Sequence, residues 1–176
     1  MTEDLKDAIV RAVIAGDVVA LTRLATDHGA AAVRLDGDPE ELTALHLAAA
    51  AGQLAAVEFL LSPAVEADPR AARINNFTPL HSAAMKGHAA VCAALLQAGA
   101  GVNVQTAPQG YAPLHSAAFA GHLAAIRVLL AAGGDRARTN YRGERPADTA
   151  TRQGQSEAAQ LLASEAEPGA AADPAS

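Results

Sequence analysis

Histidine is the residue type in this sequence whose chemistry first needs an explanation. Six histidines occur in 176 residues, and an imidazole can bind zinc or act as a general base near neutral pH. Five of them form two recurring sets, His46, His81 and His115, and His88 and His122. The first set is spaced by roughly 34 residues, and no Cys-x-x-Cys, His-x-x-x-His or carboxylate cluster accompanies either set. The pattern therefore predicts a structural role for these five histidines and no metal site.

The single cysteine and the paired carboxylates do not indicate catalysis. Cys92 has no second cysteine for an internal disulfide, and it lies in an apolar stretch that predicts a buried, unreactive thiol. Glu40 and Glu41 are adjacent, but they lie in a loop that offers no pocket. The glycines are spaced singly, unlike those of a phosphate-binding loop. We therefore expect no catalytic residue and no cofactor.

The composition is that of a globular chain with a modest negative charge. Apolar residues account for 51% and charged residues for 18%, and the formal net charge is -6. This charge argues against general nucleic-acid binding. No secretory signal is visible, and no stretch approaches the roughly 20 apolar residues of a membrane span. We therefore expect one soluble, cytoplasmic domain that neither enters a membrane nor binds nucleic acid.

An internal repeat defines the elements that position the histidines. Three segments share a pattern and a fourth is a degenerate copy: Thr43-Ala44-Leu45-His46-Leu47-Ala48, Thr78-Pro79-Leu80-His81-Ser82-Ala83, Ala112-Pro113-Leu114-His115-Ser116-Ala117 and Arg145-Pro146-Ala147-Asp148-Thr149-Ala150. A glycine follows nine residues after the start of each copy: Gly52, Gly87, Gly121 and Gly154. A repeat of this length is typical of a solenoid of stacked units.

Each copy contains the signals that begin and end a short helix. Thr43 and Thr78 are suited to the N-cap, where a hydroxyl accepts an unpaired backbone N–H. Proline follows at the first helical position in three copies, and the glycine ends the helix. A second helix ending in paired leucines follows, over 54–61, 89–96 and 123–130. Helices this short are unstable alone, so packing between units must stabilise them.

These segments resemble the ankyrin repeat, a helix–turn–helix–hairpin unit of about 33 residues with a Thr-Pro-Leu-His signature. Gly87-His88, Gly121-His122 and residues 97–103 also match that family. The resemblance implies an all-α ankyrin-repeat solenoid over residues 1–163, with five units at about 4–35, 36–72, 73–105, 106–138 and 139–163. It also implies a structural signature, Thr43, His46, Thr78, His81 and His115, and hydrogen bonds by which all five recurring histidines join neighbouring hairpins. Residues 164–176, rich in Ala, Glu, Pro and Gly, are predicted to form a disordered tail.

The departures from the repeat pattern are specific. Ala112 replaces the capping threonine, which is expected to cost about 1 kcal/mol. Asp148 replaces the signature histidine, and three glutamines make the last unit polar, as a terminal cap requires. Residues 36–42 and 62–73 are expected to lengthen two of the hairpin loops, which we call fingers.

The resemblance also selects a recognition surface, because ankyrin domains usually bind through the finger tips and the inner face of the first helices. On this chain the surface comprises Leu42, Asn75, Phe77, Met85, Lys86, Gln109, Tyr111, Phe119, Tyr141, Arg142 and Arg152. An aromatic and methionine stripe with a polar rim is typical of an interaction site. We therefore predict a central apolar groove across the second and third full repeats. In the alternative interpretation, Phe77 and Tyr111 cover their own hairpins, and Met85 and Phe119 fill contacts between repeats.

Charge is distributed unevenly along the chain. Residues 1–41 contain nine acidic and four basic side chains, whereas residues 136–152 contain five arginines and two acids. The arginines could clamp an acidic partner or a phosphate, or they could form a solvated edge, screened by Glu165 and Glu167.

The expected function is noncovalent binding of another protein or peptide by a chain that is a monomer on its own. It would be an adaptor, or an inhibitor of an enzyme. Two alternatives stay open: self-association of the acidic first unit with the basic last unit, and a designed ankyrin binder. The uneven repeat lengths favour a natural chain. An enzyme or small-molecule binder is disfavoured, because a solenoid groove is shallow and open.

Overall fold

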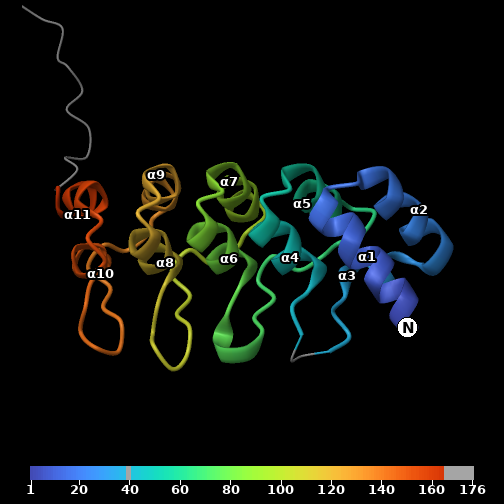
Figure 1. Cartoon of the computed structure of the whole chain (residues 1–176), viewed down its shortest axis with the longest axis horizontal. Coiled ribbons are helices and arrows are strands. Elements are labelled where there is room, and N and C mark those ends of the chain that lie inside the picture. The colour runs from blue at the N-terminus through green and yellow to red at the C-terminus, as the bar shows by residue number, and fades with distance from the viewer. Residues whose placement is uncertain (39–40, 165–176) are drawn as a thin grey trace, which may run out of the picture.

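A computed structural model describes residues 1–38 and 41–164. These residues form helix pairs stacked side by side, and they include no β-strand. In Figure 1, α4, α6, α8 and α10 form one row, α5, α7, α9 and α11 form the second row, and the fingers project beyond the first. The predicted all-α solenoid is therefore confirmed. Of the predicted disordered tail, only Ser164 lies within the described residues.

The helices have these bounds: α1 Glu3–Ala15, α2 Val18–His28, α3 Ala30–Arg34, α4 Ala44–Ala51, α5 Leu54–Leu61, the 3-10 turn η1 Ile74–Asn76, α6 Pro79–Lys86, α7 Ala89–Gln97, α8 Pro113–Ala120, α9 Leu123–Ala131, α10 Pro146–Arg152 and α11 Ser156–Ala163. Leu45, Leu80 and Leu114 on successive first helices are fully buried. Leu60, Leu95 and Leu129 on the second helices are buried as well. The core is thus one continuous layer between repeats, as nearest-neighbour stacking requires.

A threonine and the signature histidine together begin α4 and α6. Thr43 Oγ1 lies 2.8 Å from His46 Nδ1 and accepts the His46 backbone N–H at 3.4 Å. At α6, Thr78 Oγ1 lies 2.8 Å from His81 Nδ1, and the Thr78 backbone N–H also donates to that nitrogen at 3.2 Å. The predicted cap is therefore confirmed for Thr43, whose hydroxyl accepts a backbone N–H, whereas the Thr78 hydroxyl pairs with the His81 ring.

The other ring nitrogen of each signature histidine reaches the next repeat. Nε2 of His46 lies 3.1 Å from the carbonyl of Phe77, Nε2 of His81 lies 3.0 Å from that of Tyr111, and Nε2 of His115 lies 3.1 Å from that of Glu144. A carbonyl only accepts, so Nε2 carries the hydrogen and Nδ1 is the acceptor at the start of the helix. Each accepting residue ends a finger, which confirms the predicted link between hairpins for these three histidines.

Burial keeps the three signature imidazoles neutral. All three side chains are fully buried, and desolvation lowers the pKa of His46 and of His81 to about 4. The pKa of His115 is lowered for the same reason. A neutral ring is also what the hydrogen bonds require, because a protonated Nδ1 could not accept at the start of the helix.

The bonds of the signature histidines form a row along the solenoid, which we call the histidine ladder. His88 and His122 form a second such row, and its acceptors differ from the expected ones. Their Nε2 atoms lie 3.2 Å from the Ala50 carbonyl and 3.1 Å from the Met85 carbonyl, at the ends of the preceding first helices. These two histidines therefore join helix ends rather than hairpins. Gln53 does the same in the first pair of units, because its Nε2 donates to the Ile14 carbonyl at 2.8 Å.

The glycines at the helix ends make room for this second ladder. At Gly87, φ is +78° and a Cβ atom would lie 2.6 Å from Nδ1 of His122. Any other residue would therefore meet both backbone strain and a clash with the ring.

In the first and last described units, an aspartate occupies a position at which other repeats have a side chain that bonds to the neighbouring repeat. Asp17 precedes α2, in the first unit that the structure describes, and it accepts the Ala20 backbone N–H at 2.9 Å. Asp148 occupies the signature position of the last unit and accepts the Arg145 backbone N–H at 2.9 Å. Each aspartate thus caps its own helix instead of bonding to a neighbour, which makes these units suitable ends.

The insertion at residues 62–73 is not wholly a finger. Val65 is buried in the core, and the Ala67 N–H donates to the Leu60 carbonyl at 2.9 Å. The first part of this segment therefore covers the end of α5. The finger begins where the Arg73 N–H donates to the Phe77 carbonyl at 2.9 Å.

The missing threonine at the start of α8 gives a stability prediction. The Ala112 N–H still donates to His115 Nδ1 at 3.2 Å, so only the hydroxyl is absent. Ala112→Thr should raise the free energy of unfolding by about 1 kcal/mol because it restores the cap. Urea denaturation measures the gain, and Thr78→Ala should give a loss of similar size. An unchanged or lower midpoint for Ala112→Thr would show that the site does not accept the cap.

The buried histidines predict a pH dependence. Their pKa is lower in the folded chain than the ordinary 6.5, so below pH 6.5 the unfolded chain binds protons that the folded chain does not. Stability should therefore be complete above pH 6.5 and fall between pH 6.5 and 4, by at most about 1.4 kcal/mol per pH unit for each histidine. Urea denaturation across this range tests it. His81→Asn should be less stable at pH 7 yet lose less on acidification, and an equal slope would contradict the assignment.

Candidate functional site

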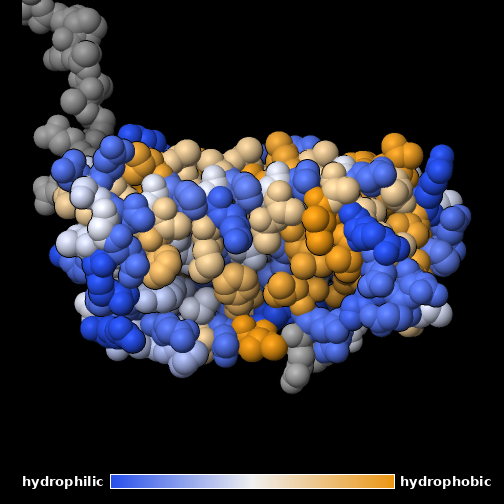
Figure 2. Space-filling view, in the orientation of Figure 1, coloured by the Kyte–Doolittle hydropathy of each residue, from blue (hydrophilic) through white to orange (hydrophobic). Residues whose placement is uncertain are grey.

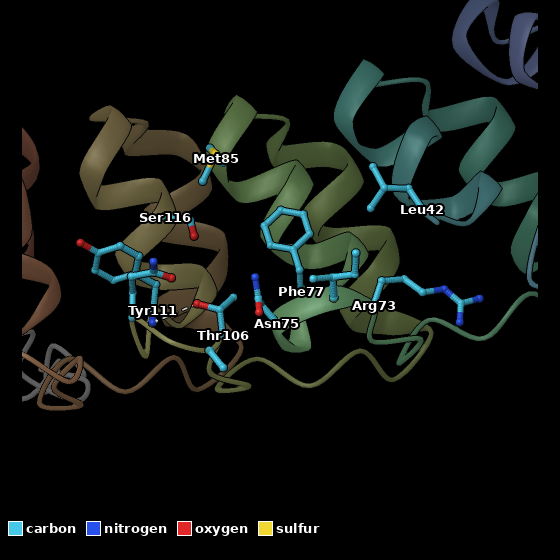
Figure 3. A pocket seen from close by; sticks show the side chains of 11 residues that line it. Leu42, Arg73, Asn75, Phe77, Met85, Thr106, Tyr111 and Ser116 are labelled. Atoms are coloured by element: carbon cyan, nitrogen blue, oxygen red, sulfur yellow. Dashed lines mark hydrogen bonds between the residues drawn. The ribbon is translucent and has the colours of Figure 1, made fainter. Parts of the chain in front are cut away.

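A groove of about 380 Å³ lies where the fingers before α6 and α8 meet the first helices. We call it the central groove, and its lining residues are Leu42, Arg73, Ile74, Asn75, Phe77, Met85, Thr106, Ala107, Gln109, Tyr111 and Ser116. Figure 3 shows Phe77 and Asn75 in the middle, Met85 above them, Leu42 and Arg73 at one end and Tyr111 at the other. The structure thus brings together six of the residues predicted from sequence: Leu42, Asn75, Phe77, Met85, Gln109 and Tyr111.

The aromatic rings in the groove rest on the signature histidines. The Phe77 ring lies 5.5 Å from that of His81 and 6.3 Å from that of His46, and both pairs are stacked. The Tyr111 ring lies 5.8 Å from that of His115. Both aromatic side chains are half-buried, so one face covers the hydrogen-bonded histidines and the remainder borders the groove. Both rings therefore pack on the histidines as well as bordering the groove, and the alternative interpretation stays a prediction.

Left-handed asparagines shape the finger before α6. Asn75 and Asn76 have φ of 62° and 59°, a conformation that asparagine tolerates better than other non-glycine residues. The Asn75 carbonyl accepts the Ala107 N–H at 2.6 Å, and Asn76 Nδ2 donates to the Gln105 carbonyl at 2.7 Å. These bonds hold neighbouring fingers together, and the Asn75 side chain projects into the groove (Figure 3).

Five groove-lining residues were not predicted: Arg73, Ile74, Thr106, Ala107 and Ser116. Ile74 is 56% exposed, and it stands four residues before Thr78, just as Tyr141 stands four residues before Arg145. Comparison of the finger positions between repeats could have found it, because Tyr141 was selected. Arg73 lies one position earlier, and its Nη2 donates to the Asp36 carbonyl at 3.3 Å. No sequence signal separates this arginine from the others.

The other five predicted residues lie outside the groove lining. Lys86, Phe119 and Arg142 are exposed, and Phe119 is 43% exposed on α8. Tyr141 packs on Gly110, where a Cβ atom would lie 2.6 Å from its ring. Arg152 donates from Nη2 to the Tyr111 hydroxyl oxygen at 3.2 Å.

The arginine-rich end is largely paired with acidic residues. Arg138 lies 3.7 Å from Asp135, Arg145 lies 3.1 Å from Asp148, and Arg152 lies 3.2 Å from Glu144. Hydrogen bonding from Arg145 also lowers the pKa of Asp148. Arg136 donates to the Ser164 carbonyl. These contacts neutralise much of the charge that the sequence suggested as a clamp, while Glu165 and Glu167 lie outside the described residues.

Figure 2 shows how hydropathy is distributed on the face seen in Figure 1. Apolar surface gathers over the row of first helices toward the N-terminal half and at one finger near the middle, whereas the last repeat is mainly hydrophilic. An apolar area beside a polar one is compatible with the core and rim of an interface.

The described residues contain no group of three or more histidine, cysteine or acidic side chains placed to hold a metal ion. Cys92 is buried, and desolvation raises the pKa of its thiol to about 12. A thiol with that pKa is not a nucleophile near neutral pH. Within residues 1–38 and 41–164, no helix combines the length and the apolar character needed to cross a membrane.

Comparison with protein families decides the classification. The family model described as ankyrin repeats (3 copies) matches residues 64–140 and 80–172, and the model described as ankyrin repeat matches residues 40–73. The chain belongs to the ankyrin-repeat family. Ankyrin repeats are generally protein–protein interaction modules and are typically non-enzymatic. A comparison with curated proteins gave no significant match.

The two phenylalanines of this ankyrin surface should respond differently to truncation. Phe77→Ala should lower the free energy of unfolding by about 2 kcal/mol, because it removes a half-buried ring from the histidine ladder. Phe119→Ala should change it by less than about 0.5 kcal/mol. Thermal and urea denaturation of both variants measure the difference. Equal losses would show that Phe119 is part of the core, and two unchanged midpoints would show that Phe77 does not support the ladder.

Proposed function

We propose that this chain binds another protein noncovalently through its finger tips and the concave face of its first helices, with the central groove at the centre of the interface. The observation that carries the proposal is the exposure of large apolar side chains in that groove. Ile74 is 56% and Met85 is 41% exposed. Such side chains are more stable when a partner removes them from water.

Rigidity of the groove also supports binding. The Phe77 and Tyr111 carbonyls are fixed by the signature histidines, and the fingers bond to one another through Asn75 and Asn76. A surface that is already ordered loses little conformational entropy when a partner binds. Exposed residues beside the groove, among them Lys86, Phe119 and Arg142, would then form the rim.

In this proposal the chain supplies no chemistry of its own. It acts as an adaptor that brings its partner to another site, or as an inhibitor that covers the partner's active surface. Its location in the cytoplasm and its monomeric state stay predictions. Self-association of the first and last units finds less support, because Arg138, Arg145 and Arg152 already pair with acids of the chain.

The test is a comparison of two double variants as affinity baits in lysate of the native host. Ile74→Asp with Met85→Glu places two charges in the groove. Val19→Asp with Ala124→Glu is the control, because both residues are exposed on second helices, α2 and α9, and neither lines the groove. The groove variant should lose a protein that wild type and control retain, with affinity reduced at least about tenfold.

Circular dichroism and urea denaturation establish that both baits are folded. If the folded groove variant retains every protein that the wild type captures, the groove is not the binding site. Loss of the same protein from both variants would also contradict the proposal, because the effect would then not be specific to the groove.

A further inference from the structure

One arginine in the central groove differs from the other arginines with buried side-chain atoms. Nε is buried and without a hydrogen-bond partner in Arg34, Arg73 and Arg138. Arg34 nevertheless has a carboxylate oxygen of Asp36 at 3.1 Å, and Arg138 has one of Asp135 at 3.7 Å. Among the described residues, Arg73 has no carboxylate within 4 Å. Within residues 1–38 and 41–164, its guanidinium is therefore a cation in the groove wall without the carboxylate partner that the other two have.

The neighbours of Arg73 make the groove selective. Arg73 is the charged residue among the groove-lining residues, and the rest are apolar or neutral polar side chains. Leu42 and Ile74 lie beside it, and both are exposed. In Figure 3, Arg73 and Leu42 lie at one end of the groove, and Phe77 lies between them and Tyr111. A cation at the edge of an apolar surface can bind an acidic side chain of a partner while the apolar surface contacts an adjacent apolar side chain.

We propose that the central groove binds a segment of another protein that carries an acidic side chain next to a large apolar one. The acidic side chain pairs with Arg73, and the apolar side chain covers Ile74, Phe77 and Met85. The proposal rests on the proposed function and names the chemistry of the partner. Charge complementarity carries it, because a partly buried guanidinium forms a charge-assisted hydrogen bond with a carboxylate.

The position of the groove favours a partner carboxylate from an Asp or Glu side chain over one from the partner's C-terminus. The lining residues come from three successive repeats, from Leu42 through Phe77 to Tyr111. A segment lying across them enters over one finger and leaves over another. The exposed amide of Asn75, between Phe77 and Thr106 in Figure 3, can bond to the backbone of such a segment.

The experiment selects peptides from a random phage-display library, fused at their C-termini, against the full chain. The expected consensus is Asp or Glu beside a large apolar residue, bound by wild type and not by the Ile74→Asp, Met85→Glu variant. A synthetic consensus peptide, with its C-terminus amidated, and its acid-to-amide analogue are then measured by fluorescence polarisation. Arg73→Gln should weaken binding of the acidic peptide about tenfold or more and leave the amide analogue unchanged.

Arg127→Gln is the control for loss of a positive charge, since Arg127 is exposed on α9 and does not line the groove. Groove-dependent peptides without an acid, or equal weakening of both peptides by Arg73→Gln, would overturn the acidic preference while the proposed function stands. A requirement for a free C-terminal carboxylate would overturn it too. Peptides that bind the groove variant as well as wild type, or no enriched peptide at all, would contradict the proposed function itself.

Discussion

Each signature histidine spans two repeats, because Nδ1 accepts hydrogen at the start of its own helix while Nε2 donates to the finger of the next. This bond requires a neutral ring, and the fully buried position of His46 and His81 keeps the ring neutral. The short helices cannot be stable alone, so stability depends on contacts between units. The finger that receives the bond also carries the groove aromatic, and Phe77 stacks on both histidines. The interaction that joins the repeats therefore also holds the aromatic side chains of the central groove.

The first and last described units also reflect the need to bond each repeat to its neighbour. Where a neighbour exists, a histidine or glutamine reaches it. In the first and last units that the structure describes, Asp17 and Asp148 instead bond to their own helices. The proposed binding site uses the side chains that these bonds leave exposed, which are the apolar residues at the fingers and an arginine without a carboxylate among the described residues. In this proposal, adjacent positions of one repeat serve either the contact with the neighbouring repeat or the contact with a partner.

Sequence periodicity predicted the solenoid and the helix caps, because the same residue types recur at the same positions of successive repeats. The resemblance to the ankyrin repeat implied the hydrogen bonds of the signature histidines and six of the groove residues, because that family usually binds through equivalent positions of successive units. The pairing of Arg152 with Glu144 and the burial of Val65 were not predictable. Those contacts depend on a long-range side-chain geometry and on an insertion with no counterpart in the other repeats. Arg73 was missed because it is distinguished by the lack of a carboxylate partner among the described residues, which a sequence does not display.

The central claim is that neutral, hydrogen-bonded histidines hold one repeat to the next, and nuclear magnetic resonance of the 15N-labelled imidazoles tests it most directly. At pH 5.5, His46 and His81 should remain in the neutral tautomer with hydrogen on Nε2, and that hydrogen should exchange slowly with water. Rings of His46 and His81 that are protonated at this pH, or that carry the hydrogen on Nδ1, would contradict the account.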